Sequence, residues 1–176
     1  CSNLIPLKRV ELILAALSLI HDLKIEWVHF GDGPLFNELK ELSKGISENI
    51  TIHWKGRVSN TEVLKFYQNE GVSCLMNVST SEGVPVSIME AMSFGIPVIA
   101  TEVGGNGEIV NNDNGILLSA NPSIDEVKES ILKLIVLDQK LMDSKRANAF
   151  STWQQEYSAD KNYTEFTESL VSIFQD

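Results

Sequence analysis

Short apolar runs alternate with longer amphipathic stretches along most of this chain, and that alternation limits the possible folds more than any other feature. The runs are short and rich in β-branched or aromatic residues, which favours strands over helices. The predicted strands are Lys24–Phe30, Ile50–Lys55, Val72–Val78, Ile96–Thr101 and Gly115–Leu118. Strands that alternate with helices form a parallel sheet covered on both faces. The sequence therefore predicts an α/β, Rossmann-like fold that binds ligands at the carboxyl ends of its strands.

The stretches between the strands have helical periodicity or helix-start signals. Pro34 stands at a first-turn position, and Ser123 is followed three residues later by Glu126, as in a capped helix. The predicted helices are Leu7–Asp22, Pro34–Lys44, Asn60–Asn69, Pro85–Phe94 and Ser123–Leu137, with a short turn at Glu108–Val110. Because the chain opens directly on a helix, we expect a first strand to lie before Cys1.

The character of the chain changes after residue 120. We expect two consecutive helices over Ser123–Ala149 and a further helix over Ser151–Asp176. The last stretch carries five aromatic residues: Trp153, Tyr157, Tyr163, Phe166 and Phe174. A helix this aromatic is expected to pack on a core or on a neighbouring domain. The predicted organisation is one Rossmann-like domain over residues 1–150 and a C-terminal helix over residues 151–176.

Composition excludes several classes of protein. A formal net charge of −10 disfavours nucleic acid as a partner and membrane attachment through this domain. No apolar run approaches the ~18 residues that a membrane span needs. Cys1 and Cys74 fit neither a disulfide framework nor a metal-ligand spacing, which favours a reduced, cytoplasmic setting. His21, His29 and His53 show no metal-site spacing, and no Asp-x-Asp pair is present, so no bound metal is expected.

The strongest local feature is the segment Ser81–Met92, which follows the third predicted strand. Glu82 lies in the strand-to-helix turn and Glu90 stands eight residues later. The free N–H groups at the start of the following helix suit a phosphate, and carboxylates nearby can accept hydrogen bonds from sugar hydroxyls. Either glutamate alone is explained as a favourable partner of the helix dipole. The spacing, together with Gly83, favours a ligand site.

Two weaker features accompany it. Gly31–Pro34 closes a strand and opens a helix, where glycines allow close approach of a ligand, although a plain tight turn explains them equally well. It also lacks the third glycine of the dinucleotide fingerprint. Lys8 and Arg9 lie in the first turn of the first predicted helix, where a cation opposes the dipole unless an anion binds nearby. Solvated surface charge is the alternative.

In their order along the chain, these segments resemble the C-terminal, donor-binding domain of GT-B-fold retaining glycosyltransferases of the large family four, the glycosyl transferases group 1. The similarity covers about residues 2–136. It rests on Ser2–Lys8, Gly31–Pro34, Lys55–Val58, the Glu-x7-Glu pattern of Glu82–Glu90, Gly95–Thr101 with Gly104–Gly105, and Asn114–Gly115. The set as a whole is specific, although each piece alone is common.

The resemblance implies a role for each candidate residue. Lys8 and Glu82 are the implied catalytic residues: Lys8 neutralises the donor diphosphate and Glu82 contacts donor-sugar hydroxyls. Glu90 binds the ribose. The other implied donor-binding positions are Gly31 and Gly33 beside the nucleotide, Arg57 and Val58 at the base, and the main chain of Gly83, Val84, Val86 and Ser87 at the phosphates. Hexosyl transfer then retains the anomeric configuration without a metal or other cofactor.

The resemblance also implies a partner domain, and this sequence departs from the family's pattern at one position. In this family an N-terminal domain binds the acceptor, so residues 1–150 form the nucleotide-sugar-binding half and the last helix packs back towards that domain. The full-length enzyme then acts in the cytoplasm, at the inner face of the membrane if its acceptor is a lipid. Asn3 stands where the family carries a phosphate-binding arginine, and Arg9 is a candidate replacement.

Two alternatives remain beside the enzyme. One is a non-catalytic nucleotide-binding or regulatory module of the same fold, to which Asn3 gives weight. The other is an interaction domain of flavodoxin-like shape without a ligand. The base, the sugar, the acceptor and the oligomeric state depend on the pocket and on the partner domain.

Overall fold

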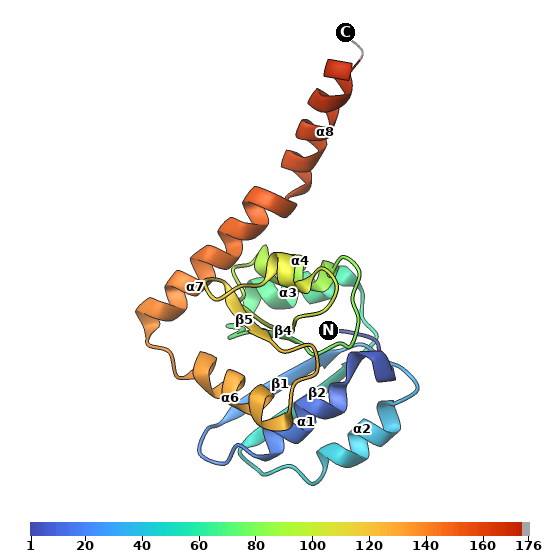
Figure 1. Ribbon diagram of the computed structural model, residues 1–176. Helices are drawn as coiled ribbons and strands as arrows, with labels where there is room; N and C mark the ends of the chain where they lie inside the picture. Colours follow the sequence, from blue (N-terminus) through green and yellow to red (C-terminus); the bar gives the residue numbers. More distant parts are fainter. Residues whose placement is uncertain (174–176) are drawn as a thin grey trace.

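The computed structural model describes residues 1–173, with the side chains of Asp160, Glu165, Ser169 and residues 171–173 left aside. Five strands form two parallel half-sheets (Figure 1). One pairs β1 (Ile25–Phe30) with β2 (Ile50–Gly56). The other has the order β3-β4-β5, formed by Leu75–Asn77, Val98–Thr101 and Gly115–Leu118. The predicted α/β, Rossmann-like fold of parallel strands with helices on both faces is confirmed.

Helices cover both faces of the strands because apolar side chains of a strand point alternately to either side. Val98 and Ala100 of β4 face one cluster, which includes Ile88 of α4 (Val86–Met92). Ile99 faces the opposite cluster, which includes Leu17 of α1 (Val10–Ser18). The first cluster also contains residues of α3 (Asn60–Asn69) and α7 (Gln139–Thr152), and the second contains residues of α6 (Ile124–Ile135).

Two predicted strands are shorter than expected. Val72–Val78 reduces to Leu75–Asn77, and Ile96–Thr101 reduces to Val98–Thr101. β3 pairs with β4 along one edge only, so its ends lack the ladder partners that would extend it. β1 does not pair with β3, and the single predicted sheet is therefore divided into two.

The predicted first helix, Leu7–Asp22, is interrupted. A 3₁₀ turn, η1 (Pro6–Lys8), is separated from α1 by Arg9, which adopts a left-handed conformation with φ 47°. No other non-glycine residue among the described ones has positive φ. Helical periodicity alone cannot reveal this break, because its cause is a long-range interaction of the Arg9 side chain.

The other helices lie where the sequence predicts them, but several begin or end at different residues. α3 has the predicted bounds, but its N-cap is Ser59, which forms a capping box with Glu62. Ser123 caps α6 by accepting from the N–H of Glu126, as predicted. α2 (Phe36–Ser43) begins two residues after Pro34. α5 (Asn106–Ile109) replaces the short turn expected at Glu108–Val110.

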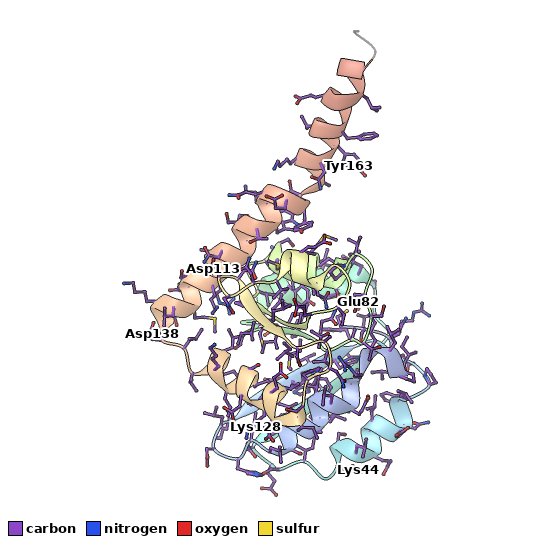
Figure 2. The ribbon with its side chains drawn as sticks, in the orientation of Figure 1. Lys44, Glu82, Asp113, Lys128, Asp138 and Tyr163 are labelled. Carbon is purple, nitrogen blue, oxygen red and sulfur yellow. The ribbon has the colours of Figure 1, made fainter. Side chains whose placement is uncertain are left out.

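The C-terminal part is not one helix. α7 continues to Thr152, a π-helical turn, η2 (Trp153–Tyr157), follows, and α8 (Ala159–Ile173) begins after Ser158. Trp153 and Tyr157 pack against the core as expected. α8 projects away from the body, and Tyr163 and Phe166 on it are 72% and 63% exposed (Figures 1 and 2). Phe174 lies outside the described residues. No helix in residues 1–173 has the length and hydropathy to cross a membrane.

Candidate donor-binding site

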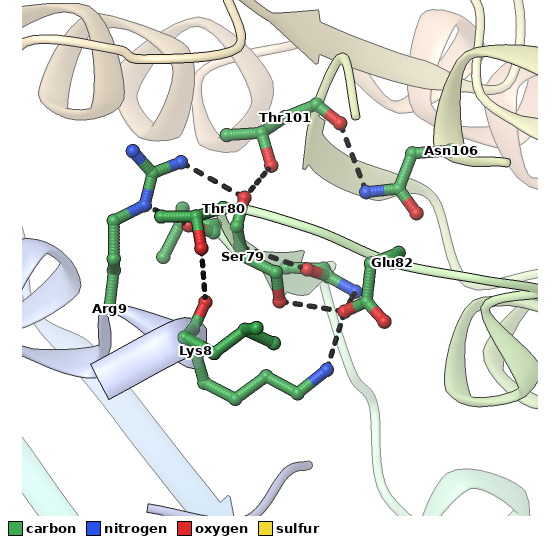
Figure 3. Close-up of polar contacts among 10 residues, drawn as sticks. Lys8, Arg9, Ser79, Thr80, Glu82, Thr101 and Asn106 are labelled. Atoms are coloured by element: carbon green, nitrogen blue, oxygen red, sulfur yellow. Dashed lines mark hydrogen bonds and ion pairs between the residues drawn. The ribbon is translucent and has the colours of Figure 1, made fainter. Parts of the chain in front are cut away.

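A polar cluster surrounds Glu82 at the carboxyl end of β3. Its Oε1 accepts from Lys8 Nζ at 2.6 Å, Ser79 Oγ at 2.6 Å and Asn77 Nδ2 at 2.9 Å (Figure 3). Lys8 comes from η1, 74 residues away in sequence, so the fold itself assembles the pair. The Lys8 and Glu82 side chains are only 22% and 12% exposed. The structure thus brings the two predicted catalytic residues into direct contact.

The cluster sets the charge of Glu82. Burial raises the pKa of this carboxyl, but hydrogen bonds from Lys8, Ser79 and Asn77 and the charge of Lys8 outweigh burial and leave the pKa below its usual value. Glu82 is therefore ionised at neutral pH. Its second oxygen, Oε2, has no hydrogen-bond partner in the part of the chain that the structure describes, and it can accept from a ligand hydroxyl.

The Arg9 side chain makes no bond to Glu82 within the described residues. Its guanidinium donates to the main-chain oxygens of Val78 at 2.6 Å, Ser79 at 3.0 Å and Ala120 at 3.1 Å, and to Asn121 Oδ1 at 2.9 Å. These bonds tie η1 to the loops that follow β3 and β5. Four of the five guanidinium N–H donors of Arg9 are thus bound to the protein's own oxygens, which disfavours Arg9 as a replacement for the phosphate-binding arginine.

Further polar groups hold the loop after β3 in place. Thr101 Oγ1 donates to the oxygen of Ser79 at 2.7 Å, and Asn106 Nδ2 donates to the oxygen of Thr101 at 3.0 Å (Figure 3). Both side chains are fully buried. Sequence reasoning missed Asn77, Ser79 and Thr101, although each lies at the carboxyl end of a strand, where the fold predicts ligands.

The turn between Glu82 and α4 presents main-chain donors. Within the described residues, the N–H groups of Gly83, Val84 and Ser87 donate to no acceptor, whereas the N–H of Val86 donates to the oxygen of Val84 at 2.9 Å. Pro85 precedes the helix and supplies no side-chain cap. Three of the four predicted main-chain positions are therefore free to bind an anion, and the fourth is occupied.

Glu90 lies apart from the Lys8–Glu82 pair. Its Oε1 accepts from Asn60 Nδ2 at 2.7 Å, which connects α4 to the start of α3. The buried Tyr67 is close by: burial and then the charge of Glu90 raise the pKa of Tyr67 to about 12. No hydrogen bond joins Glu90 to Lys8 or Glu82 within residues 1–173. Asn60 is a second partner that sequence reasoning missed.

The family match covers this whole arrangement. Residues 1–151 match the family described as glycosyl transferases group 1. The chain belongs to this family.

Curated relatives agree with this assignment. An uncharacterized glycosyltransferase of Methanocaldococcus jannaschii is 35% identical over 132 residues, covering 74% of this chain and 36% of that protein. The N-acetyl-alpha-D-glucosaminyl L-malate synthase of Bacillus anthracis is 22% identical, covering 99% of this chain and 45% of that protein. This chain thus spans less than half the length of these two curated relatives.

Solved structures share the fold. Anabaena HepE in complex with UDP-glucose matches with a TM-score of 0.79 at 23% identity, covering 97% of this chain and 47% of that one. The C-terminal domain of a group 1 family glycosyl transferase from Francisella tularensis matches with a TM-score of 0.74 at 23% identity, covering 89% of this chain and 83% of that one. At such identities the match concerns the fold alone.

In this group 1 glycosyltransferase domain, close backbone packing explains why Gly31 and Gly33 are glycines. A Cβ on Gly31, which has φ 130°, would lie 1.8 Å from the oxygen of Ser2, and one on Gly33 would lie 2.4 Å from the oxygen of Leu4. Gly31 and Gly33 therefore let the chain's own first residues pass against the end of β1. This close packing is between parts of the chain itself, so close approach of a ligand at Gly31 and Gly33 stays a prediction.

The predicted base-flanking residues follow β2. Arg57 is exposed, and Val58 is half-buried against the core cluster that contains Phe30. Gly56, which precedes them, turns the chain with φ 66°. This geometry leaves Arg57 available to a ligand and gives Val58 a packing role.

The three histidines form no metal site. Within the described residues, no group of three His, Cys, Asp or Glu side chains could hold a metal ion. His29 is buried, its Nε2 lies 3.1 Å from the oxygen of Ser2, and burial followed by the charge of the amino terminus lowers its pKa to about 4. His29 is thus a neutral core residue, and His53 pairs with Glu26 at 2.8 Å on the surface.

Proposed function

We propose that this chain is the donor-binding half of a retaining family-four glycosyltransferase that moves a hexosyl group from a nucleotide-diphosphate sugar to a glycan, lipid or small acceptor. The observation that carries the proposal is the Lys8–Glu82 pair at the carboxyl end of β3, where a Rossmann-like sheet binds its ligands. The solved structure of HepE, which is similar in fold and contains UDP-glucose, supports a nucleotide sugar as the partner.

The roles follow from the free donors and acceptors of the site. Lys8 Nζ gives one of its three donors to Glu82 and keeps two for the diphosphate. The N–H groups of Gly83, Val84 and Ser87 add neutral donors for the same group. Glu82 Oε2 accepts from a sugar hydroxyl, and Glu90 accepts from the ribose hydroxyls. The leaving diphosphate is then stabilised by preorganised donors without a metal.

Arg57 and Val58 flank the base, and Gly31 and Gly33 keep the β1 turn close to the nucleotide. Residues 1–150 form the donor domain, and the helix from residue 151 onwards packs towards an acceptor-binding domain. The exposed Tyr163 and Phe166 of α8 support this packing, since aromatic side chains are enriched at buried interfaces. We place the enzyme in the cytoplasm, in polysaccharide or glycoconjugate biosynthesis.

The test is sugar transfer by the protein that carries both halves, comparing Lys8→Met with the matched control Lys44→Met. Lys44, the C-cap of α2, pairs with Glu41 at the same 2.6 Å, but these side chains are 64% and 69% exposed (Figure 2). Lys8→Met should lower kcat at least about 100-fold, because one charged donor to the leaving group is worth roughly 3 kcal/mol. Unchanged kcat in Lys8→Met contradicts the assigned role.

A non-catalytic nucleotide-binding module is the second candidate. The Arg9 guanidinium is bound to main-chain oxygens, so Lys8 contacts Glu82 without a second cation beside it. This arrangement favours the non-catalytic module. This module binds a nucleotide sugar without transferring the sugar to any acceptor, so the same assay separates the two candidates.

A further inference from the structure

The two carboxylate oxygens of Glu82 have different surroundings. Oε1 accepts three hydrogen bonds, from Lys8 Nζ, Ser79 Oγ and Asn77 Nδ2, whereas Oε2 accepts none within residues 1–173 (Figure 3). A carboxylate has about four lone-pair sites on its two oxygens, so three donors on Oε1 leave no site there for a ligand. The orientation of the carboxylate therefore decides where the free acceptor, Oε2, points.

The three donors to Oε1 differ in how firmly they are held. Lys8 reaches Glu82 from η1 with a long, flexible side chain, and on the proposed function its ammonium also binds the diphosphate. Asn77, in contrast, is the last residue of β3 and pairs with Ala100 of β4. Ser79 lies two residues further on and is only 1% exposed. The two uncharged donors are thus fixed by the sheet and its buried loop, whereas the Lys8 donor is shared with the ligand.

Every polar group of Ser79 is hydrogen-bonded. Its N–H donates to Asn77 Oδ1 at 3.1 Å, and its main-chain oxygen accepts from Arg9 Nη2 at 3.0 Å and from Thr101 Oγ1 at 2.7 Å. These partners come from β3, from the residue between η1 and α1, and from β4. The main chain of Ser79 is therefore held by three separate elements, and its hydroxyl donates to Glu82 Oε1 at 2.6 Å (Figure 3).

We propose that Ser79 and Asn77 are positioning residues for the donor sugar, which hold the Glu82 carboxylate in one orientation, with Oε2 towards the sugar hydroxyl, independently of Lys8. The inference rests on the proposed function, in which Glu82 accepts from that hydroxyl. Because both donors are uncharged, they occupy Oε1 without adding a cation that would compete with Lys8 for the diphosphate. Glu82 therefore keeps its orientation when the Lys8 ammonium turns towards the leaving group.

The same two donors also act on the protonation of Glu82. Burial raises the pKa of this carboxyl, and the hydrogen bonds from Lys8, Ser79 and Asn77, with the charge of Lys8, bring the pKa below its usual value. In the described part of the chain, Lys8 is the charged side chain that contacts Glu82, and Glu90 of α4 makes no bond to it. Removing the Ser79 hydroxyl takes away a donor and no charge, so the pKa of Glu82 should rise. A serine that served packing alone would leave this pKa unchanged.

Ser79→Ala in the protein that carries both halves tests the inference by two measurements. NMR titration of the glutamate carboxyls, with Glu82 assigned through Glu82→Gln, should show its pKa raised. The Kd of the nucleotide sugar should rise about tenfold or more, whereas the Kd of the free nucleoside diphosphate of the same base should change less than about twofold, because it carries no sugar. Ser130→Ala is the matched control: the buried Ser130 hydroxyl donates to the oxygen of Glu126 at 2.8 Å on α6, so both measurements should match wild type.

Asn77→Ala removes the second uncharged donor and should change both measurements in the same directions, so it decides the matter if Ser79→Ala does not fold. An unchanged pKa of Glu82 in either variant overturns the inference. So does a Kd that rises equally for the nucleotide sugar and the free diphosphate, because the effect is then not on the sugar. A wild type that binds no nucleotide sugar contradicts the proposed function and this inference together, whereas wild-type binding with an unchanged Kd in Ser79→Ala contradicts this inference alone.

Discussion

The role of Arg9 in the structure differs from the role that the sequence suggests. Its left-handed backbone and its bonds to Val78, Ser79 and Ala120 make it a structural clamp between η1 and the loops after β3 and β5. Nothing in the local pattern reveals this role, because the partners lie about 70 and 110 residues away. Composition and helical periodicity describe near neighbours only.

Two substitutions at Arg9 separate the contribution of its side-chain hydrogen bonds from the cost of its positive φ. Arg9→Ala loses the hydrogen bonds and keeps the cost of positive φ, so the free energy of unfolding should fall by about 2 kcal/mol or more. Arg9→Gly loses the same bonds but accepts φ 47°, and should be about 1 kcal/mol more stable than Arg9→Ala. Urea unfolding of both variants measures the difference, and an alanine variant as stable as wild type contradicts the clamp.

Glu82 links stability to pH. Because its pKa in the folded chain is below the ordinary value of 4.5, its contribution is complete above that value and is lost as the pH falls through the lowered pKa. Glu82→Gln should cost about 1 kcal/mol at pH 7, and this difference should shrink as the pH falls through the lowered pKa of Glu82. A difference that stays constant between pH 7 and pH 3 would show that the charge of Glu82 is not involved.

At the scale of elements, the loop after β4 supports the Glu82 turn. A Cβ on Gly104, which has φ 50°, would lie 1.8 Å from the oxygen of Glu82, and the N–H of Gly105 donates to the oxygen of Gly83 at 3.2 Å. Two loops that follow neighbouring strands are thereby packed backbone to backbone. The position of the candidate site thus depends on a glycine outside it.

Gly104→Ala should therefore displace the Glu82 turn and destabilise the fold by about 2 kcal/mol or more, through strain and a backbone clash. Gly83→Ala is the matched control in the same region, because a Cβ there meets nothing within 4 Å, and it should change stability by less than about 0.5 kcal/mol. Thermal unfolding compares them, and equal stability of the two variants would argue against the contact.

The elements themselves were largely predictable, and their interruptions were not. Short β-rich runs and the Ser123–Glu126 cap follow local rules, so β1, β2, β5 and α6 lie where the pattern indicates. The separation of the half-sheets and the left-handed Arg9 depend on partners across the fold. The same division holds at the site: Lys8 and Glu82 were predicted, whereas Asn77, Ser79 and Asn60 were found from their contacts.

At the scale of the whole molecule, charge makes anion binding a local matter. The chain carries a formal net charge of −10, so its overall field repels a diphosphate. On the proposed function, Lys8 and the free N–H groups of Gly83, Val84 and Ser87 supply the attraction at short range. Loss of the Lys8 charge should accordingly affect binding far more than loss of a surface lysine.

The central claim is that Lys8 and Glu82 form a nucleotide-sugar site, and titration of the protein carrying both halves with UDP, GDP, ADP and their sugars tests it most directly. One nucleotide series should bind, with Kd raised about tenfold or more by Lys8→Met and unchanged by Lys44→Met. Absence of binding by every nucleotide at millimolar concentration, or an unchanged Kd in Lys8→Met, would contradict the account.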